Sequence, residues 1–217
     1  MRATTRRSST ALAATAAAGA LVVAQGVPAH ADEEVSEPHE FTSMYTVEAD
    51  PDMVVDDEEQ PVPGEEGAWG TFDFRINSDE EVICYDIELE GVTPPYESPA
   101  RTATHIHEAS AEEFGPPRLA FPDPEDEGDG VLRSSGCMQG PFTTGVEDDE
   151  GNDTGEGFTL DQIEADPESF YADTHTADFP DGAIRGQLWE VPMGGMETGG
   201  GGSAGLLPTL LTGAGDR

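Results

Sequence analysis

The chain has no lysine and only nine arginines, three of them within the first seven residues. All 46 aspartates and glutamates follow residue 31, so residues 32–217, with six arginines, carry a formal charge of −40. A surface of this sign repels polyanions, which excludes nucleic acid and anionic lipid as partners. The acids themselves have two interpretations: a solvated surface suited to high salt, or loose capture of cations such as calcium.

Cysteine is almost as scarce, with only Cys84 and Cys137. In an exported protein a single pair is expected to form a disulfide, and closing a loop of about fifty residues would stabilise the fold by roughly 4 kcal/mol. Metal ligation or a reactive thiol is the alternative. A nucleophilic cysteine needs an activating base, and no neighbouring residue in the sequence supplies one.

No apolar run is long enough to be a convincing membrane span. The longest, Ala11 to Ala24, follows three arginines and precedes Ala29-His30-Ala31, an A-x-A cleavage pattern. This order is typical of a secretory signal, so residues 1–31 are predicted to be a signal peptide. The alternatives are an uncleaved anchor or a disordered N-terminus. A cleaved signal implies a secreted, extracellular protein with no membrane insertion afterwards.

Long amphipathic helices are also missing; the only helical turn expected is Phe158 to Ala165. Many short alternating segments separated by turn residues instead predict an all-β, antiparallel sandwich or barrel. The expected strands are 41–47, 69–76, 82–89, 103–108, 118–121, 131–138 and the two arms of a hairpin within 170–188.

The domain organisation follows from shifts in composition. Residues 32–40 are expected to be a disordered acidic linker, 41–191 the β-domain, and 192–217 a flexible Gly-rich tail. The apolar stretch Leu206 to Gly213 resembles a cell-wall sorting signal only faintly. We therefore expect a disordered end, with attachment to the cell wall as the alternative.

The segment from Phe170 to Leu188 reads as a hairpin whose turn is Pro180-Asp181-Gly182. Its second arm carries Arg185, whose guanidinium can pair with a carboxylate. We expect a structural ion pair between Arg185 and Asp173, or alternatively Asp178; recognition of a ligand is the other role considered for Arg185.

These residues resemble the CHRD domain, a module named after chordin and found in secreted bacterial proteins. The resemblance covers about residues 41–190 and is carried by Ile83 to Ile87, by Thr104-His105-Ile106-His107-Glu108 with Gly115-Pro116, and above all by the 170–188 hairpin. This chain differs in having Asp173 where Asn or another polar residue is usual, and in its acidic loops. The resemblance implies an immunoglobulin-like β-sandwich with no established reaction.

Three histidines are the candidates for site chemistry. On a strand, His105 and His107 project from the same face, and His175 is a third ligand if its strand is adjacent. The cofactor would be copper or zinc. The structural alternative is that these rings bond to backbone or to acids such as Glu108 and Asp173.

The His-x-His strand is also similar to the copper-binding strand of copper–zinc superoxide dismutase. The further histidines of that enzyme's zinc site have no counterpart in this domain, so the sequence favours at most a mononuclear three-histidine site. Our expectation is a monomeric extracellular binding or structural module, not an enzyme, whose partner is an extracellular protein or cell-surface component. The alternative function is binding of copper or zinc at the three-histidine site, distantly like superoxide dismutase and with metal-dependent redox activity.

Overall fold

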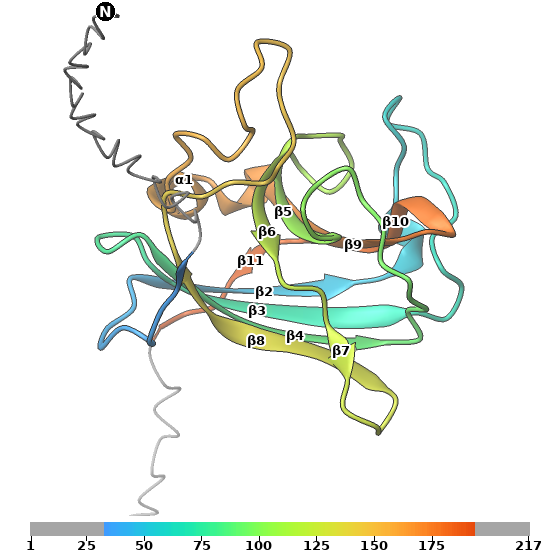
Figure 1. The fold of residues 1–217 in the computed structure, drawn as a ribbon, viewed down its shortest axis with the longest axis horizontal. Helices are drawn as coiled ribbons and strands as arrows, with labels where there is room; N and C mark the ends of the chain where they lie inside the picture. The colour runs from blue at the N-terminus through green and yellow to red at the C-terminus, as the bar shows by residue number, and fades with distance from the viewer. Residues whose placement is uncertain (1–32, 194–217) are drawn as a thin grey trace, which may run out of the picture.

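The computed structural model describes residues 33–193, which form two antiparallel β-sheets packed face to face (Figure 1). This confirms the all-β sandwich. The predicted signal peptide and nearly all of the predicted tail lie outside the described residues. The elements are β1 (Glu33–Glu34), β2 (Ser43–Ala49), η1 (Pro51–Met53), β3 (Trp69–Asn77), β4 (Val82–Glu90), β5 (Thr104–Glu108), β6 (Pro117–Phe121), β7 (Glu125–Asp126), β8 (Val131–Gln139), α1 (Asp161–Ala165), η2 (Pro167–Ser169), β9 (Phe170–Thr176), β10 (Phe179–Gln187) and β11 (Trp189–Glu190).

The larger sheet has the order β1-β8-β4-β3-β2-β11, with β7 paired to β8. Its strands alternate because one face meets the other sheet and the other meets solvent. In β3, for example, Phe72, Phe74 and Ile76 are completely buried, while Asp73 between them is exposed. The apolar residues that alternate with polar ones in the sequence therefore form the inner face of this sheet.

The smaller sheet has the order β10-β9-β5-β6 and is buried on both faces. Its inner face contributes Ile106, Ala172 and Ile184 to the core. Its outer face lies beneath loops, and all seven residues of β9 are consequently buried. The histidines lie on this covered outer face, where a polar cluster has little contact with water.

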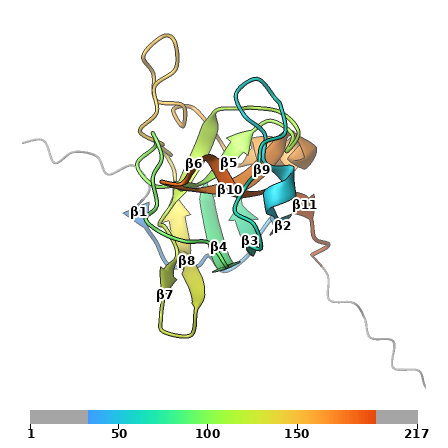
Figure 2. The same ribbon diagram turned by 90° about the vertical axis from the view of Figure 1, so that its right-hand side faces the viewer.

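The two sheets are joined where β10 passes into β11. β10 pairs with β9, whereas β11 pairs with β2 of the other sheet (Figure 2). Gly186 permits this crossing, because a Cβ there would lie 2.3 Å from the carbonyl oxygen of Glu48. Asp50 and Arg185 exchange two backbone hydrogen bonds of 3.1 Å at the same place. The crossing fixes β10, and Arg185 with it, relative to the large sheet.

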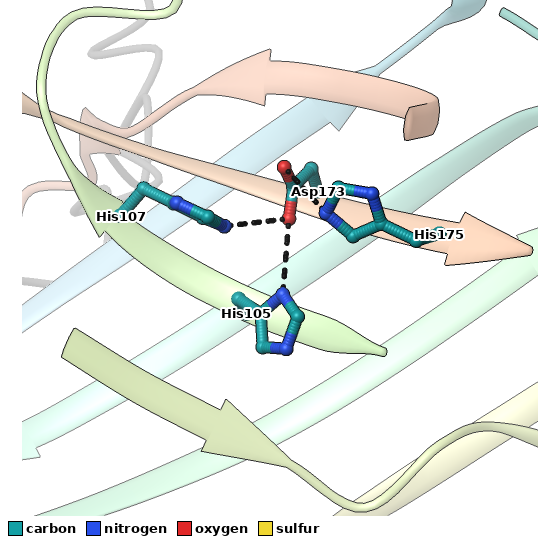
Figure 3. A group of neighbouring side chains, drawn as sticks. All are labelled: His105, His107, Asp173 and His175. Carbon is teal, nitrogen blue, oxygen red and sulfur yellow. Dashed lines mark ion pairs between the residues drawn. The ribbon is translucent and has the colours of Figure 1, made fainter. Parts of the chain in front are cut away.

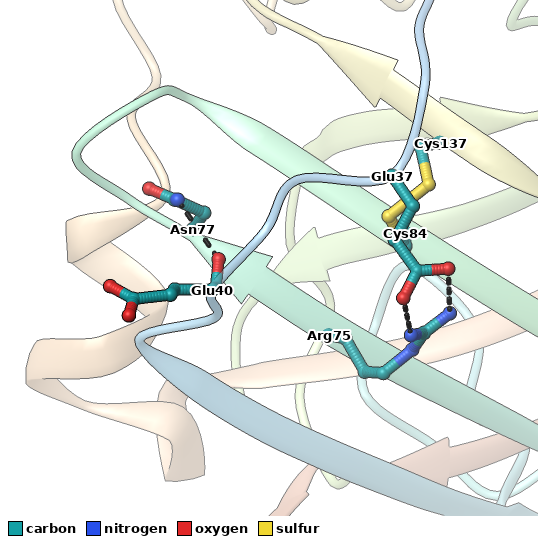
Figure 4. The surroundings of a disulfide bond; sticks show 6 residues. All are labelled: Glu37, Glu40, Arg75, Asn77, Cys84 and Cys137. Atoms are coloured by element: carbon teal, nitrogen blue, oxygen red, sulfur yellow. Dashed lines mark hydrogen bonds and ion pairs between the residues drawn. A yellow bond between two sulfur atoms is a disulfide. The ribbon is translucent and has the colours of Figure 1, made fainter.

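Cys84 and Cys137 lie directly opposite each other on β4 and β8 and form a disulfide with an S–S distance of 2.08 Å, as predicted (Figure 4). The disulfide packs with Val35 and Phe41 of the N-terminal segment. Both sulfurs are therefore used structurally, and neither is a free thiol or a metal ligand.

The segment before β2 differs from the linker that the sequence suggested. β1 pairs with β8, Glu37 forms an ion pair with Arg75 at 2.5 Å, and Asn77 donates to the Glu40 carbonyl at 3.0 Å (Figure 4). Residues 33–40 thus lie along the large sheet. Backbone pairing at an open sheet edge attaches them despite their acidic composition.

The 170–188 hairpin differs from the sequence prediction in the position of its turn. Its turn is Ala177-Asp178, and Pro180-Asp181-Gly182 forms an irregularity inside β10, where the register shifts between Phe179 and Ile184. Gly182 has φ 134°, a value that residues with a side chain rarely adopt, which explains why a glycine occupies this position.

The helical turn predicted for residues 158–165 is shorter in the structure, where α1 covers only Asp161–Ala165. No helix within residues 33–193 has the length and apolarity to span a membrane.

Candidate metal centre

His105, His107 and His175 meet on the outer face of the small sheet, around the carboxylate of Asp173 (Figure 3). The antiparallel pairing of β5 with β9 causes this, because it sets His105 opposite Asp173. The two-residue period of each strand then brings His107 and His175 to the same face. The juxtaposition on which the metal hypothesis depended is therefore present.

The three rings point at the carboxylate from different sides. Asp173 Oδ1 lies 3.1 Å from His107 Nε2 and 3.6 Å from His105 Nδ1, and Asp173 Oδ2 lies 3.2 Å from His175 Nε2. One ligand atom from each of the four residues can be chosen so that all lie within 4.8 Å of one another. The set offers three nitrogens and one oxygen.

The other nitrogen of each ring contacts a backbone carbonyl. His105 Nε2 lies 2.7 Å from Thr102 O, His107 Nδ1 2.8 Å from Gly115 O, and His175 Nδ1 2.8 Å from Pro180 O. A carbonyl only accepts, so each of these outer nitrogens carries the proton. In a neutral ring, the nitrogen facing Asp173 then presents its lone pair to the centre of the cluster.

Local backbone features supply two of these carbonyls. At Gly115 an added Cβ would lie 2.2 Å from the Glu108 carbonyl, so only glycine lets the loop fold back until its own carbonyl reaches His107. The irregularity at Pro180-Asp181-Gly182 turns the Pro180 carbonyl toward His175. The sequence motif that resembled a turn thus orients an imidazole.

Burial and charge set the ionisation of the cluster. Burial alone would raise the pKa of Asp173, but the surrounding histidines outweigh it and hold that pKa well below its usual range. Burial lowers the pKa of His105. At His175 burial works in the same direction, but the Asp173 carboxylate outweighs it and raises the pKa. The centre therefore holds an ionised carboxylate beside a neutral His105.

Several inner atoms are left without hydrogen bonds. Among the described residues, neither oxygen of Asp173 has a hydrogen-bond partner, and the same is true of His105 Nδ1 and His107 Nε2. Buried polar atoms are ordinarily paired, so four such atoms facing one another require an explanation. A cation among them would satisfy all four at once.

Arg185 lies at the edge of this cluster. Its Nη2 is 4.0 Å from Asp173 Oδ2, whereas its hydrogen bonds go to the carbonyls of Glu113 and Val55. Its guanidinium lies 4.2 Å from the centroid of the Tyr171 ring. The alternative partner, Asp178, is exposed in the turn. The guanidinium is thus held mainly by backbone and ring contacts, with Asp173 at the limit of ion-pair distance.

Sequence reasoning placed Asp173 only as a partner of Arg185 or of a histidine, and missed it as a fourth ligand. A sequence pattern could have predicted this role for Asp173, because Asp173-x-His175 repeats the spacing of His105-x-His107 on a neighbouring strand. Glu108, the other acid considered, instead pairs with Arg118 at 2.6 Å.

Comparison with known proteins agrees with this fold. The sequence model of the CHRD domain matches residues 53–188, from η1 to the end of the 170–188 hairpin. No curated protein and no solved structure gives a significant match. CHRD domains occur in secreted proteins, and the Cys84–Cys137 disulfide is compatible with an extracellular location. The match spans more than half of the chain, which therefore belongs to the CHRD domain family.

Proposed function

We propose that this CHRD domain is a secreted metal-binding module that holds one zinc or copper ion through His105, His107, His175 and Asp173. The observation that carries the proposal is the division of roles within each imidazole. The outer nitrogen is fixed by a backbone carbonyl, and the inner nitrogen faces the shared carboxylate. Metal-bound histidines characteristically have this outer hydrogen bond, which sets the tautomer and the ring orientation.

The four ligand atoms, all within 4.8 Å of one another, would have to draw together around such an ion. With metal–ligand bonds of about 2.0–2.1 Å, neighbouring ligand atoms of a tetrahedral site are about 3.3 Å apart. The distances from Asp173 Oδ1 to His107 Nε2 and His105 Nδ1, 3.1 and 3.6 Å, bracket that value, and His175 Nε2 lies 3.2 Å from the other oxygen, Oδ2. Imidazole suits zinc and copper, and a carboxylate completes a set common for zinc. His175 would lose any proton on its inner nitrogen when the ion binds.

The electrostatic argument favours the same conclusion. Asp173 is completely buried, and a buried charge needs compensation. The nearest fixed cation, Arg185, lies 4.0 Å away and donates its hydrogen bonds elsewhere. A divalent ion would neutralise the carboxylate and accept the lone pairs that now face it. Its role in this proposal is binding and stabilisation; we propose no reaction.

The test is the metal content and metal affinity of the purified protein. We expect close to one equivalent of zinc or copper by elemental analysis, and reloading after chelation. At a free-metal concentration of 100 times Kd, binding should stabilise the fold by about 2.7 kcal/mol, measurable as a rise in Tm.

Variants separate the site from general effects. His107→Ala and Asp173→Asn should each weaken binding by at least about tenfold, since each removes or neutralises a ligand. His39→Ala is the matched control, because His39 is exposed and outside the cluster. Circular dichroism checks that each variant folds. A folded wild-type protein that neither retains nor takes up these metals would overturn the proposal, leaving the interaction module as the function.

A further inference from the structure

The three imidazoles line one wall of a small cavity of about 170 Å³ between the outer face of the small sheet and the loops above it. The opposite walls come from Ala100, Phe114 and Val146, which belong to three separate loops. The side chain of Phe114 is 56 % exposed, so the cavity meets solvent beside it. Since a liquid water occupies about 30 Å³, the space suits a molecule of a few heavy atoms.

All four candidate ligands come from a single sheet face, two from β5 and two from β9. The covering loops and the irregularity in β10 contribute backbone carbonyls to the outer ring nitrogens, but no further histidine, cysteine or carboxylate to the cluster within residues 33–193. Asp173 does not line the cavity, whereas all three histidines do. A metal held this way would have Asp173 and the sheet on one side and the cavity lined by the imidazoles on the other.

The walls also indicate which molecules could enter. Apart from the histidines, the lining residues are uncharged, and most are Pro, Ala, Phe, Gly or Val. No arginine lines the cavity, and the chain as a whole carries a formal charge of −37. Apart from the bound metal itself, no charge on these walls would compensate an anion that leaves water, and the negative charge of the whole chain would repel the anion at long range.

We propose that the bound metal, held by its four protein ligands, keeps a fifth coordination position open toward this cavity and that the position takes a small uncharged ligand. This inference rests on the proposed metal site and extends it from a closed structural ion to a receptor for a small neutral molecule. Four protein ligands complete a tetrahedral zinc site, whereas Cu(II) prefers a tetragonal geometry that leaves room for a further ligand, so the inference concerns the copper-loaded protein.

The experiment uses the full secreted protein loaded with one equivalent of Cu(II). Imidazole at pH 8, where it is uncharged, is the neutral probe, and azide is the anionic one. Electron paramagnetic resonance with ¹⁴N- and ¹⁵N-imidazole detects coordination directly, and gel filtration confirms that copper stays on the protein. We expect saturable imidazole binding and at least tenfold weaker azide binding.

Ala100→Phe and Val146→Phe should fill the cavity from two sides. Each should keep its copper and lose at least tenfold in imidazole affinity. Thr93→Phe, at an exposed position of the loop that carries Ala100, is the control and should bind imidazole normally.

The outcomes separate the two proposals. Copper binding without any imidazole signal would overturn the open position and leave the metal site intact. Equal binding of azide, or unchanged imidazole binding in both filled variants, would overturn the neutral-ligand cavity. Failure to bind copper or zinc at all would remove the metal site itself and the open position with it.

Discussion

At the scale of single residues, Asp173 and Arg185 are the two buried charges of the outer face. They are neighbours across the β9–β10 pair, and different groups surround the two charges. Asp173 is surrounded by imidazoles, whereas Arg185 bonds to two carbonyls and covers the Tyr171 ring, on which His107 also stacks at 4.7 Å. Arg185 therefore positions Tyr171 and, through it, His107.

Replacing Arg185 by Met should destabilise the protein by about 3–5 kcal/mol, because the change leaves two carbonyls without their donor and removes the cation 4.0 Å from the buried Asp173 carboxylate. Urea unfolding measures the effect. Arg75→Met is the control: its ion pair with Glu37 is exposed, and its loss should cost less than about 1 kcal/mol. Equal losses in the free energy of unfolding for the two variants would show that Arg185 contributes no more to stability than an exposed ion pair.

At the scale of elements, α1 is too short to hold itself in place and is attached through Glu164. This carboxylate accepts hydrogen bonds from Thr42 at 2.5 Å and from Ser43 and Ser78 at 2.7 Å. Burial acts to raise its pKa, but these three hydroxyls outweigh burial and lower it below its usual value near 4.5. The ionised form thus links α1 to β2 and to the β3–β4 turn.

Because the folded-state pKa of Glu164 is lowered, its contribution is complete above about pH 5 and is lost as the pH falls through the folded value. Glu164→Gln should cost about 1 kcal/mol at pH 7, and the difference from wild type should shrink at pH 3. Urea unfolding at the two pH values provides the measurement, with Glu168→Gln, an exposed acid on η2, as control. A difference that grows at pH 3 would contradict this assignment.

The disulfide connects β4 to β8 across 53 residues of chain. Replacing both cysteines by Ala should lower the free energy of unfolding by up to about 4 kcal/mol, chiefly because the unfolded chain gains freedom. Denaturation of the double variant, compared with wild type under oxidising conditions, measures this loss. Stability equal to wild type would contradict a stabilising role for the disulfide.

The strands themselves were largely predictable. Phe72, Phe74 and Ile76 alternate with polar residues because one face of β3 is buried, and the positions of β4, β5 and β8 follow from similar patterns. The Pro180-Asp181-Gly182 motif misled because a local turn preference is also satisfied by an irregularity within a strand. Attachment of residues 33–40 depended on an open sheet edge that local composition does not reveal.

At the scale of the whole molecule, charge is the dominant property. Only six arginines oppose 46 acids after residue 31, and much of the acidic charge lies on exposed strands and loops such as 147–150. Such a surface destabilises the compact state by self-repulsion unless salt screens it.

Raising sodium chloride from about 0.1 M to 1 M shortens the Debye length from about 10 Å to about 3 Å. We expect the free energy of unfolding to rise by at least about 1 kcal/mol over this range, measured by urea denaturation with EDTA present so that site-bound metal does not contribute. A flat or falling dependence on salt would contradict the high-salt interpretation of the acids and leave the other one, loose capture of cations such as calcium.

The sequence by itself determined the β class, the positions of most strands, the cysteine pair and the common face of His105 and His107, because these depend on residue type and on a two-residue period. Only the tertiary structure decided that Asp173 and His175, some seventy residues further on, complete the same cluster. That outcome depends on the register of β5 against β9, in which a shift of one residue would turn Asp173 and His175 to the opposite face. The carbonyls of Thr102, Gly115 and Pro180 likewise reach the rings only through the folding of two loops and the irregularity in β10, which no local pattern specifies.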